Sequence, residues 1–538
     1  MNKAKFMSRE MKKRIPRLTA NFASLVLENG YYVDKTEFIQ KLEGLNFPNL
    51  FFLRPRRFGK SLLLSMLEYY YGIQHKDKFK DLFGQYFIGQ PENVTPLRNS
   101  YYILNFSFSG IGTDVESEIK KKFEVEIRTA LKSFLYKYGI GEDREINENL
   151  NIDGSSELLR NFVTLFRRYK SDGKIYLLID EYDHFTNELF SFNTTHFKEI
   201  VSRNGWVRKF YEVIKQFMGE GIIDRFFATG VTPVTLDSMT SGFNVAKNIT
   251  LEPEFHNMGG FTEGELRGLI ENTIYEEGRF DIDAVISDLR SWYNGSRFSV
   301  DATEKLYNPQ MIVTFLFNFS SNFKYPREMA DQNVTSDYKK IANILDLLPA
   351  EVSDSIIQEI LDRDSIEEKL TIQFNFELPY TRVEAISLLF YNGLLTLRGE
   401  KFQVYDFEIP NYVIKQMYWE YFKYLFVTRH KIQYENVPVR DALIEMSETG
   451  KVTKFVEYVQ KVLKSLSNRD FQKFNEKNIK MIFMSLLMGN NAYMVMSEHE
   501  NKAGYADLLL IPSKLNPGKY NFLLELKYLK KSSKENLE

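Results

Sequence analysis

The feature that most constrains the fold is an apolar segment, a basic loop and a second apolar segment in direct succession. Residues 49–53 (NLFFL) form a short apolar run bounded by prolines, which predicts a buried strand. Residues 62–72 are apolar at helical spacing and end in glycine, which predicts a helix. The loop between them contains Gly59, Lys60 and Ser61. Strand, loop and helix in this order are the context that a phosphate-binding loop requires.

Each residue type in this loop has a chemical reason. Gly59 allows close approach of the backbone, Lys60 supplies charge for the β- and γ-phosphates, and the Ser61 hydroxyl suits Mg²⁺. The usual pattern opens with a glycine where this sequence has Arg54, so we expect Arg54 to adopt a conformation that glycine reaches more easily. An ordinary basic turn is the alternative. The predicted phosphate loop consists of Arg54, Pro55, Arg56, Arg57, Phe58, Gly59, Lys60, Ser61 and Leu62.

A second motif follows another apolar run. Residues 174–179 predict a strand of a parallel sheet covered on both faces, and Asp180 and Glu181 come directly after it. Asp180 is placed to order Mg²⁺ and Glu181 to polarise the attacking water. Thr229 or Thr232 is the candidate sensor of the γ-phosphate. A solvated strand end and a capping threonine are the alternatives. With the loop, this motif predicts a chain that binds ATP and Mg²⁺ and hydrolyses ATP.

Strands alternate with long helices over the first half of the chain, which predicts a doubly wound α/β sheet of the P-loop NTPase kind. We place a leader at residues 1–30 and the ATPase core at 31–250. Further strands are expected at 101–106 and 226–230, and helices at 115–138 and 155–170.

Helices dominate from residue 251 to residue 460. Within this part, a helix at 381–393, a hairpin at 394–407 that turns at 398–401, and a helix after Pro410 follow one another. This order resembles a winged helix, and a helical lid that carries a hairpin is the alternative. Residues 461–538 predict a small α/β unit. Its expected elements are a helix at 475–489 and strands at 491–496, 505–511 and 522–527.

Composition excludes several classes of function. The net charge is −2, so the chain is not a basic protein that coats nucleic acid, and any such contact must come from a local patch. The absence of cysteine excludes disulfides, thiolate metal sites and Cys nucleophiles. No apolar run approaches the ~18 residues of a membrane helix, and the N-terminus lacks a secretory signal. We therefore expect a cytoplasmic protein without a membrane partner.

Several segments together resemble a known family. YYVDKTEFI, FFLRPRRFGKSLLLSML, LLIDEYD, FFATGVTPV and GGFTEGEL are similar to the bacterial AAA-ATPase-like family, whose members often carry a C-terminal PD-(D/E)XK nuclease-like domain. Residues 307–309 (YNP) also match, and the resemblance covers nearly the whole chain. It implies that Asp34, Lys35 and Thr36 lie near the nucleotide. The sequence departs from the family at Asn105, where an acid is expected.

The C-terminal unit contains the order D…ExK of that nuclease fold in Asp507, Glu525 and Lys527. Two carboxylates on adjacent strand ends suit Mg²⁺, and a nearby lysine lowers the pKa of the attacking water. Solvated strand ends are the alternative. The family continues beyond the point where this chain ends, so we expect a truncated or degenerate domain. Candidates to complete the site are Glu476, Glu498 and Glu500.

These observations predict an ATP-hydrolysing regulatory protein coupled to a Mg²⁺-dependent nuclease-like module that acts on DNA or RNA, with assembly into a homo-oligomer left open. One alternative is a non-enzymatic switch that binds ATP. Another is a winged-helix DNA-binding protein with an inactive nuclease remnant. A small-molecule kinase fits less well, because it would not need several hundred residues after the core.

Overall fold

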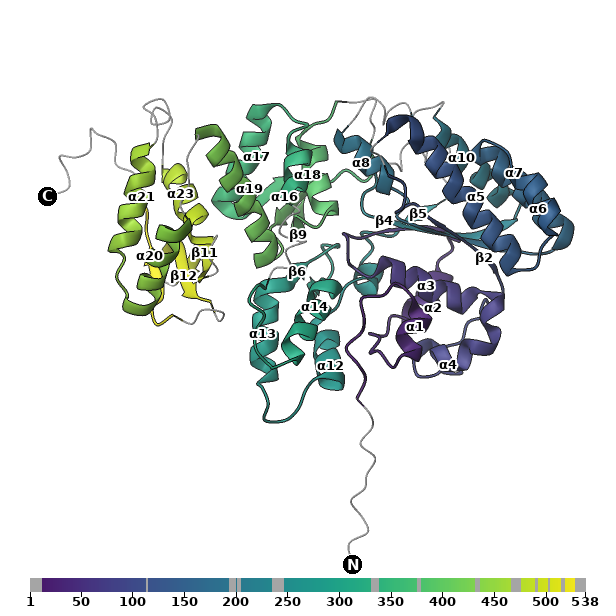
Figure 1. Cartoon of the computed structure of the whole chain (residues 1–538), viewed down its shortest axis with the longest axis horizontal. Coiled ribbons are helices and arrows are strands. Elements are labelled where there is room, and N and C mark those ends of the chain that lie inside the picture. The colour runs from purple at the N-terminus through teal and green to yellow at the C-terminus, as the bar shows by residue number, and fades with distance from the viewer. Residues whose placement is uncertain are drawn as a thin grey trace, which may run out of the picture. The chain divides into compact units, whose positions relative to one another are not determined.

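The computed structural model forms two compact units (Figure 1). The first comprises Met1–Phe317 and Glu368–Tyr405, and the second comprises Asn318–Glu367 and Asp406–Glu538. Among the described residues, no helix is both long enough and apolar enough to cross a membrane. The structure describes residues 12–112, 115–192, 200, 205–234, 246–329, 338–374, 379–430, 436–465, 476–488, 492–501, 504–513 and 518–527.

The core of the first unit is a five-stranded sheet in the order β2-β3-β4-β1-β5, with every strand pair parallel. This confirms the predicted parallel α/β sheet. Four strands fall on the predicted apolar runs, whereas β5 is too short to leave a pattern. The carboxyl ends of parallel strands meet at one edge, where ligands bind in such sheets. The strands are β1 (Asn49–Leu53), β2 (Tyr102–Ser107), β3 (Ile175–Asp180), β4 (Ile223–Gly230) and β5 (Lys247–Asn248).

Helices cover both faces of this sheet (Figure 1). Helix α3 packs against β3 and β4 on one face, whereas α5 packs on β2 and α10 on β4 on the other face. The long amphipathic segments predicted between the strands are therefore the helices that bury the sheet. The main covering helices are α3 (Lys60–Tyr71), α5 (Ile119–Lys137), α7 (Ser155–Tyr169) and α10 (Trp206–Gly219). The smaller elements are α2 (Glu37–Gly44), η1 (Ile73–Lys78), α4 (Phe79–Phe83), η2 (Phe87–Gly89), η3 (Glu116–Glu118), α6 (Asp143–Leu150) and α8 (His184–Phe192).

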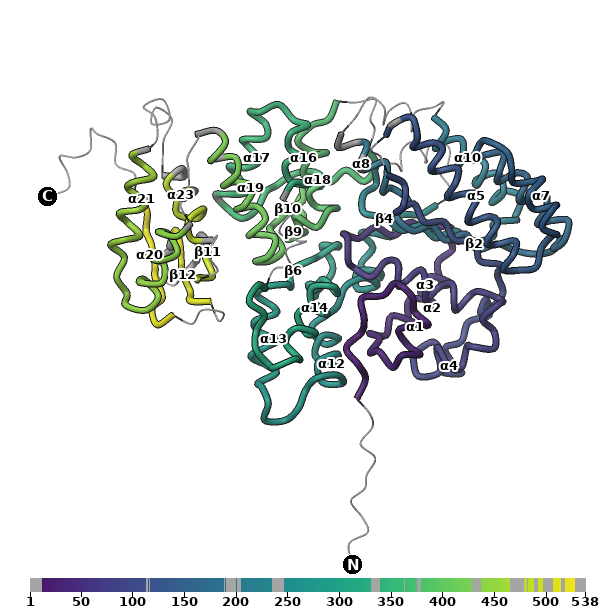
Figure 2. The backbone as a smooth tube through the Cα atoms, viewed as in Figure 1, coloured from purple at the N-terminus to yellow at the C-terminus, as the bar shows by residue number. Residues whose placement is uncertain are grey.

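The described part of the predicted leader belongs to the core. Helix α1 (Phe22–Leu27) begins at Asn21, whose side chain accepts a hydrogen bond from the Ser24 amide. Phe22 is fully buried and stacks on Phe83 with ring centroids 5.0 Å apart. Figure 2 traces the backbone from residue 12 into this helix. The boundary predicted at residue 30 therefore does not separate residues 12–30 from the first unit, because Phe22, Leu25 and Val26 are buried in that unit's core.

The first unit also continues past residue 250, where we predicted that the core would end. Phe58 of the loop packs edge-on against Phe298 at a centroid distance of 5.4 Å, and its carbonyl accepts a hydrogen bond from the Gly260 amide. The later segments are thus tied to the phosphate loop itself. Their elements are η4 (Pro253–Met258), α12 (Glu263–Thr273), α13 (Ile282–Tyr293), β6 (Asn294–Ser296), β7 (Leu306–Tyr307), α14 (Pro309–Ser320) and α18 (Arg382–Tyr391).

The predicted hairpin is present as β9 (Thr396–Lys401) and β10 (Val404–Glu408), and the strand order around it is β8-β10-β9. Its turn lies at Phe402 and Gln403, which have φ angles of 53° and 63°. The turn predicted at 398–401 was therefore placed too early, because those residues extend β9. Positive φ at both central residues is the geometry of a tight two-residue hairpin. The winged-helix interpretation stays a prediction.

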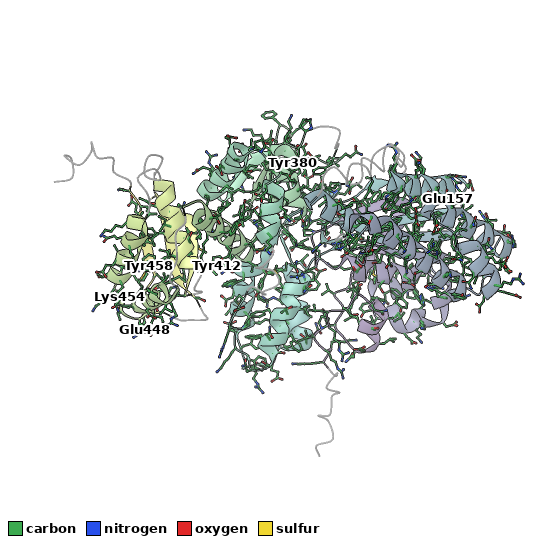
Figure 3. The ribbon with its side chains drawn as sticks, turned by 45° about the horizontal axis from the view of Figure 1, so that its top comes forward. Glu157, Tyr380, Tyr412, Glu448, Lys454 and Tyr458 are labelled. Carbon is green, nitrogen blue, oxygen red and sulfur yellow. The ribbon has the colours of Figure 1, made fainter. Side chains whose placement is uncertain are left out.

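In the second unit, a three-stranded antiparallel sheet in the order β11-β12-β13 packs against α23, and α23 packs against α19. The Tyr412 hydroxyl, labelled in Figure 3, accepts a hydrogen bond of 2.9 Å from the Val495 amide and so fixes α19 to β11. The elements are α16 (Tyr338–Leu345), α17 (Ala350–Arg363), β8 (Ser365–Glu368), α19 (Tyr412–His430), α20 (Asn436–Thr449), α21 (Thr453–Ser465), α23 (Glu476–Met488), β11 (Tyr493–Asn501), β12 (Gly504–Pro512) and β13 (Phe522–Leu524).

Candidate functional site

The loop between β1 and α3 has the backbone shape that binds an anion. Arg57 has a φ of 73° and Gly59 a φ of 86°, so two residues of the loop are left-handed. Alternation of this kind turns successive N–H groups toward one concavity. Lys60 and Ser61 begin α3, whose first-turn amides have no partner inside the helix and carry its positive dipole end. The loop therefore presents backbone donors and a helix N-terminus to the same point.

Lys60 is buried, and its ammonium group lies inside the loop. Nζ donates hydrogen bonds to the carbonyl oxygens of Arg54 (2.9 Å) and Pro55 (3.0 Å). Burial lowers the pKa of Lys60 to about 8, although the carboxylates of Asp180 and Glu181 act in the opposite direction. A buried ammonium group that has only carbonyl partners is well placed to bind a phosphate.

The backbone of Arg54 does not have the glycine-like conformation that we predicted. Arg54 is absent from the described residues with positive φ, so its backbone needs no glycine-like conformation. The side chain is 1% exposed, and the guanidinium group donates to the carbonyl oxygens of Leu53 and Thr250 at 2.8 Å, Phe255 at 2.9 Å and His256 at 3.0 Å. Arg54 therefore holds the chain after residue 250 against the loop instead of facing a phosphate.

The second motif contacts Thr229 of β4 at the carboxyl edge of the sheet. Because β4 lies between β1 and β3, its end separates the phosphate loop from Asp180. The Thr229 hydroxyl donates to Asp180 Oδ1 at 2.8 Å, and the Glu181 amide donates to the same oxygen at 3.0 Å. Of the two candidate threonines, Thr229 is thus the one in contact with Asp180.

Thr232 has a different environment. Its amide and its hydroxyl donate to Asp183 Oδ2 at 2.6 and 3.0 Å, and the Val231 amide donates to the same carboxylate at 3.1 Å. Asp183 is 1% exposed. These bonds fix the chain that follows β4, so the sensor role predicted as an alternative for Thr232 does not fit its contacts.

Glu181 has an unusual backbone conformation for a non-glycine residue, with a φ of 51°. Such conformations cost energy and cluster at functional sites. Glu181 and His184 line the same cavity, and His184 Nδ1 lies 3.6 Å from Glu181 Oε2. A strained backbone at a residue that lines the cavity therefore agrees with a functional role for Glu181.

Among Asp34, Lys35 and Thr36, only Lys35 lines the cavity. Asp34 accepts hydrogen bonds from the Thr36 amide (2.9 Å) and hydroxyl (2.7 Å) and from the Phe87 amide (2.8 Å). The buried Lys35 ammonium group pairs with Glu265 at 2.6 Å. Asp34 and Thr36 are therefore structural in this geometry, which corrects the expectation that all three lie at the nucleotide.

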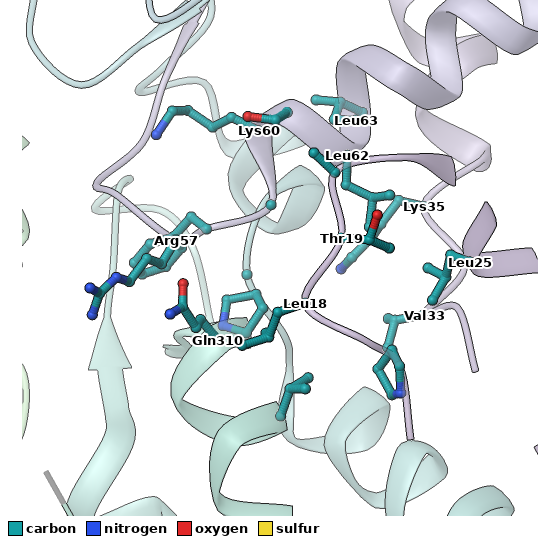
Figure 4. Close-up of a pocket in the computed structure, with 18 of the residues that line it drawn as sticks. Leu18, Thr19, Leu25, Val33, Lys35, Arg57, Lys60, Leu62, Leu63 and Gln310 are labelled. Carbon is teal, nitrogen blue, oxygen red and sulfur yellow. The ribbon is translucent and has the colours of Figure 1, made fainter. Parts of the chain in front are cut away.

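The loop opens into a cavity of about 570 Å³ (Figure 4). Its volume lies in the range of small-molecule sites. Leu18, Arg57, Lys60 and Gln310, which are labelled in Figure 4, are among the residues that line the cavity. The basic lining residues are Arg17, Lys35, Arg56, Arg57 and Lys60, and Glu181 is the carboxylate among the lining residues. The cavity therefore favours an anion.

Sequence reasoning missed Leu18, Asn308 and Gln310. Asn308 caps α14 by accepting hydrogen bonds from the Gln310 amide (3.1 Å) and the Met311 amide (3.3 Å), and its side-chain amide donates to the Arg56 carbonyl at 3.3 Å. It thus connects the phosphate loop to the start of α14. The YNP segment pointed to this position, but nothing in the sequence indicated its partner in the loop.

The oxygen ligands at the loop fit a magnesium ion that also binds phosphate. Within the described residues, Ser61 Oγ and Asp180 Oδ2 have no hydrogen-bond partner, so both remain available as ligands. The same residues contain no cluster of three or more His, Cys, Asp or Glu side chains suited to a metal. Mg²⁺ in nucleotide sites needs only one or two protein oxygens together with phosphates and waters.

Asn105, the departure from the family pattern, contacts an acid of α3. Its side-chain amide donates to Glu68 Oε2 at 2.7 Å, and Lys137 pairs with the other Glu68 oxygen at 2.6 Å. Burial alone would raise the pKa of Glu68, but the neighbouring His75 ring, the Lys137 ammonium group and the hydrogen bond from Asn105 lower it to about 2. An acid at position 105 would repel Glu68, so the two positions are chemically matched.

In the second unit the structure brings Asp507, Glu525 and Lys527 together. Leu508 pairs with Leu524 across β12 and β13, and the Leu526 amide donates to Asp507 Oδ2 at 2.6 Å. Lys527 Nζ lies 3.0 Å from Glu525 Oε1, with the two side chains 72% and 62% exposed. The side chains of the other candidates, Glu476, Glu498 and Glu500, lie outside the described part of the structure.

Comparisons with known proteins agree with this geometry. Residues 16–240 match the AAA-ATPase-like family, described as a predicted AAA-ATPase, and residues 474–538 match the PD-(D/E)XK nuclease superfamily. The chain is also 25% identical over 304 residues to an Azotobacter chroococcum mcd 1 protein called "Uncharacterized protein in vnfD 5'region". That match covers 55% of this chain and 51% of the relative, so the chain spans about half the length of the curated relative. Two parts of the chain are therefore similar to an AAA-ATPase-like domain and to a PD-(D/E)XK nuclease superfamily domain.

Proposed function

We propose that the first unit binds ATP at the phosphate loop and hydrolyses it to ADP and phosphate. The observation that carries this proposal is the meeting of three groups at one sheet edge: the buried Lys60 in its loop, the Asp180–Thr229 pair, and Glu181 in the same cavity as Lys60. Phosphate binding, metal ligation and water activation each require one of these groups. An ordinary basic turn would not bury its lysine among carbonyl oxygens.

Each residue has a role in the proposed reaction. Lys60 and the first-turn amides of α3 bind the β- and γ-phosphates, and Ser61 and Asp180 provide oxygen ligands for Mg²⁺. A bound Mg²⁺ neutralises charge on the phosphates. Glu181 accepts a proton from a water molecule whose oxygen attacks the γ-phosphorus. The bond from that phosphorus to the bridging oxygen breaks, and ADP leaves. Thr229 orients Asp180 through its 2.8 Å hydrogen bond.

A Glu181→Gln variant tests hydrolysis separately from binding. The amide cannot accept the proton, so we expect phosphate release from Mg-ATP to fall at least about 100-fold while ATP affinity stays within a few-fold of wild type. Equal phosphate release by the variant and the wild type would contradict the role of Glu181. If the wild type binds ATP but shows negligible turnover, the chain is a nucleotide-bound switch and not an enzyme.

For the second unit we propose Mg²⁺-dependent cleavage of a phosphodiester in DNA or RNA. The supporting observation is that Asp507, within β12, lies opposite the end of β13, which Glu525 and Lys527 directly follow. Carboxylates that share a metal and a lysine that acts on water require such proximity. When bound, Mg²⁺ would stabilise charge on the phosphodiester. Asp507 and Glu525 would hold the ion, and Lys527 would lower the pKa of the attacking water.

Cleavage of plasmid DNA and single-stranded RNA by the full chain tests this second proposal. We expect cleavage with Mg²⁺, its loss on addition of EDTA, and its loss in Glu525→Gln and Lys527→Met. Lys519→Met is the matched control, because Lys519 is another exposed lysine of the same unit. Cleavage that persists in both site variants would contradict the assignment, and absence of cleavage by the wild type would leave the second unit without this activity.

A further inference from the structure

The cavity extends beyond the phosphate loop, and its other walls come from two segments far apart in the sequence. One is the segment from Pro16 to Ala20, and the other is the first turn of α14 from Pro309 to Val313. The second segment lies outside residues 16–240, the range that matches the ATPase family. A ligand whose phosphates sit at Lys60 would therefore have its remaining part between Leu18 and the start of α14 (Figure 4).

The N-terminal wall of the cavity is fixed at both ends. Before it, the Arg14 amide donates to the Asn29 carbonyl and the Arg14 carbonyl accepts from the Tyr31 amide, both at 2.9 Å. After it, the Phe22 amide donates to Ser65 Oγ of α3 at 3.0 Å. The wall is thus attached to the helix whose first turn belongs to the phosphate loop. It is held in place relative to the bound phosphates.

The chemistry of these walls suits a nucleoside. Leu18 is 62% exposed although it lines the cavity, so it presents apolar surface that a ligand can cover. Buried Val33, Met258 and Val313 add further apolar lining. The side-chain amide of Gln310 makes no hydrogen bond in the part of the chain that the structure describes, and an amide can both donate to and accept from the edge of a base. Flat apolar contact with a polar edge partner is what a nucleobase requires.

We propose that Leu18 and the first turn of α14 hold the nucleoside of the bound nucleotide, so that the site is completed by residues that lie beyond the end of the matched ATPase segment. This inference rests on the proposed binding of ATP. It names Leu18 as the apolar contact to the nucleoside and Gln310 as its polar contact. Asn308 caps α14 and donates a hydrogen bond to the Arg56 carbonyl. It therefore holds the first turn of α14 at a fixed position relative to the phosphate loop.

The test compares the affinities of the full chain for Mg-ATP and for inorganic tripolyphosphate with Mg²⁺, measured by calorimetry. Tripolyphosphate occupies the phosphate loop but has no nucleoside. We expect Leu18→Ser to weaken ATP binding about ten-fold and Gln310→Ala about five-fold, with tripolyphosphate binding within two-fold of wild type in both. Unchanged tripolyphosphate binding also shows that the variants are folded.

Leu27→Ser is the matched control, since Leu27 is a second leucine that is 62% exposed but lies outside the cavity lining. It should bind both ligands as the wild type does. The inference is overturned if the wild type binds ATP and tripolyphosphate equally tightly, or if Leu18→Ser keeps full ATP affinity. Lys60→Ala separates the two proposals: it should lose both ligands, and a wild type that binds neither ligand would overturn the proposed function itself and this inference with it.

Discussion

Charged side chains gather both at the phosphate loop and at the C-terminal carboxylates, but the two groups differ in burial. Arg54 is 1% exposed and Lys60 is 7% exposed, and both donate to backbone carbonyl oxygens. The side chains of Glu525 and Lys527 are 62% and 72% exposed and pair mainly with each other. Charged groups inside the core must be satisfied by the fold, whereas exposed ones are satisfied by water. We therefore expect substitutions in the first site to lower the protein's stability and substitutions in the second site to change it little.

The largest expected effect is a loss of stability when a charged side chain of the buried site is removed. Arg54→Ala removes the donor to several buried carbonyl oxygens, so we expect the free energy of unfolding to fall by about 3 kcal/mol. Urea unfolding followed by tryptophan fluorescence measures it. Arg56→Ala is the control, because Arg56 is exposed, and it should change stability by less than about 0.5 kcal/mol. Equal effects of the two substitutions would contradict the structural role of Arg54.

The next effect depends on pH. Burial lowers the pKa of Lys60 from 10.5 to about 8. The phosphate-binding ammonium is therefore lost above pH 8, and we expect ATP affinity to fall about ten-fold per pH unit there. The sign for stability is opposite: between pH 8 and 10.5 the unfolded chain binds more protons at Lys60, so this residue's contribution to stability rises with pH. Calorimetric titration with ATP from pH 7 to 9.5 measures the first effect. In Lys60→Arg the decline should disappear, and an identical decline in both proteins would assign it to another group.

A smaller effect is expected from loss of the hydrogen bond between Thr229 and Asp180 at the sheet edge. Thr229→Val keeps the shape of the side chain but removes the hydroxyl that donates to Asp180. We expect a loss of about 1 kcal/mol in stability and a five- to ten-fold fall in ATP turnover, because Asp180 loses a fixed partner. Thr229→Ser retains the hydroxyl and should stay close to wild type in phosphate release. If Thr229→Val and Thr229→Ser have the same stability and the same rate of phosphate release, the hydroxyl's hydrogen bond contributes to neither.

The smallest effect concerns the exposed site. Lys527→Ala removes the partner of Glu525, yet both side chains are solvated, so we expect unfolding to change by about 0.5 kcal/mol or less. Thermal unfolding of the full chain measures this. A loss as large as that of Arg54→Ala would show that the second site is as deeply integrated as the first and would remove the contrast between them.

Local signals account for what could be predicted from the sequence. The run NLFFL became β1 with the predicted bounds, because five consecutive buried residues leave a clear pattern. Local motifs also indicated where the candidate site residues lie, because each motif is at the end of one strand or in the loop that follows it. These residues are Lys60, Ser61, Asp180, Glu181 and Thr229. The two-residue strand β5 has no such pattern.

Long-range contacts account for the rest. Arg54 stands at a glycine position of the usual loop, and its partners Thr250, Phe255 and His256 are about 200 residues away in the sequence. Leu18 and Gln310 line one cavity although they are far apart in the sequence. Burial of a guanidinium group among carbonyl oxygens depends on which segments meet, and no periodicity in the sequence records that.

Phosphate release from Mg-ATP by the wild type, Lys60→Ala and Lys527→Ala tests the central claim most directly. Each variant removes one lysine, one from the buried loop and one from the exposed carboxylate site. The account predicts that the wild type and Lys527→Ala release phosphate at equal rates, and that Lys60→Ala is slower by at least about 100-fold, since its loop lacks the charge that binds the phosphates. Release by Lys60→Ala at the wild-type rate, or no release by any of the three, would contradict it.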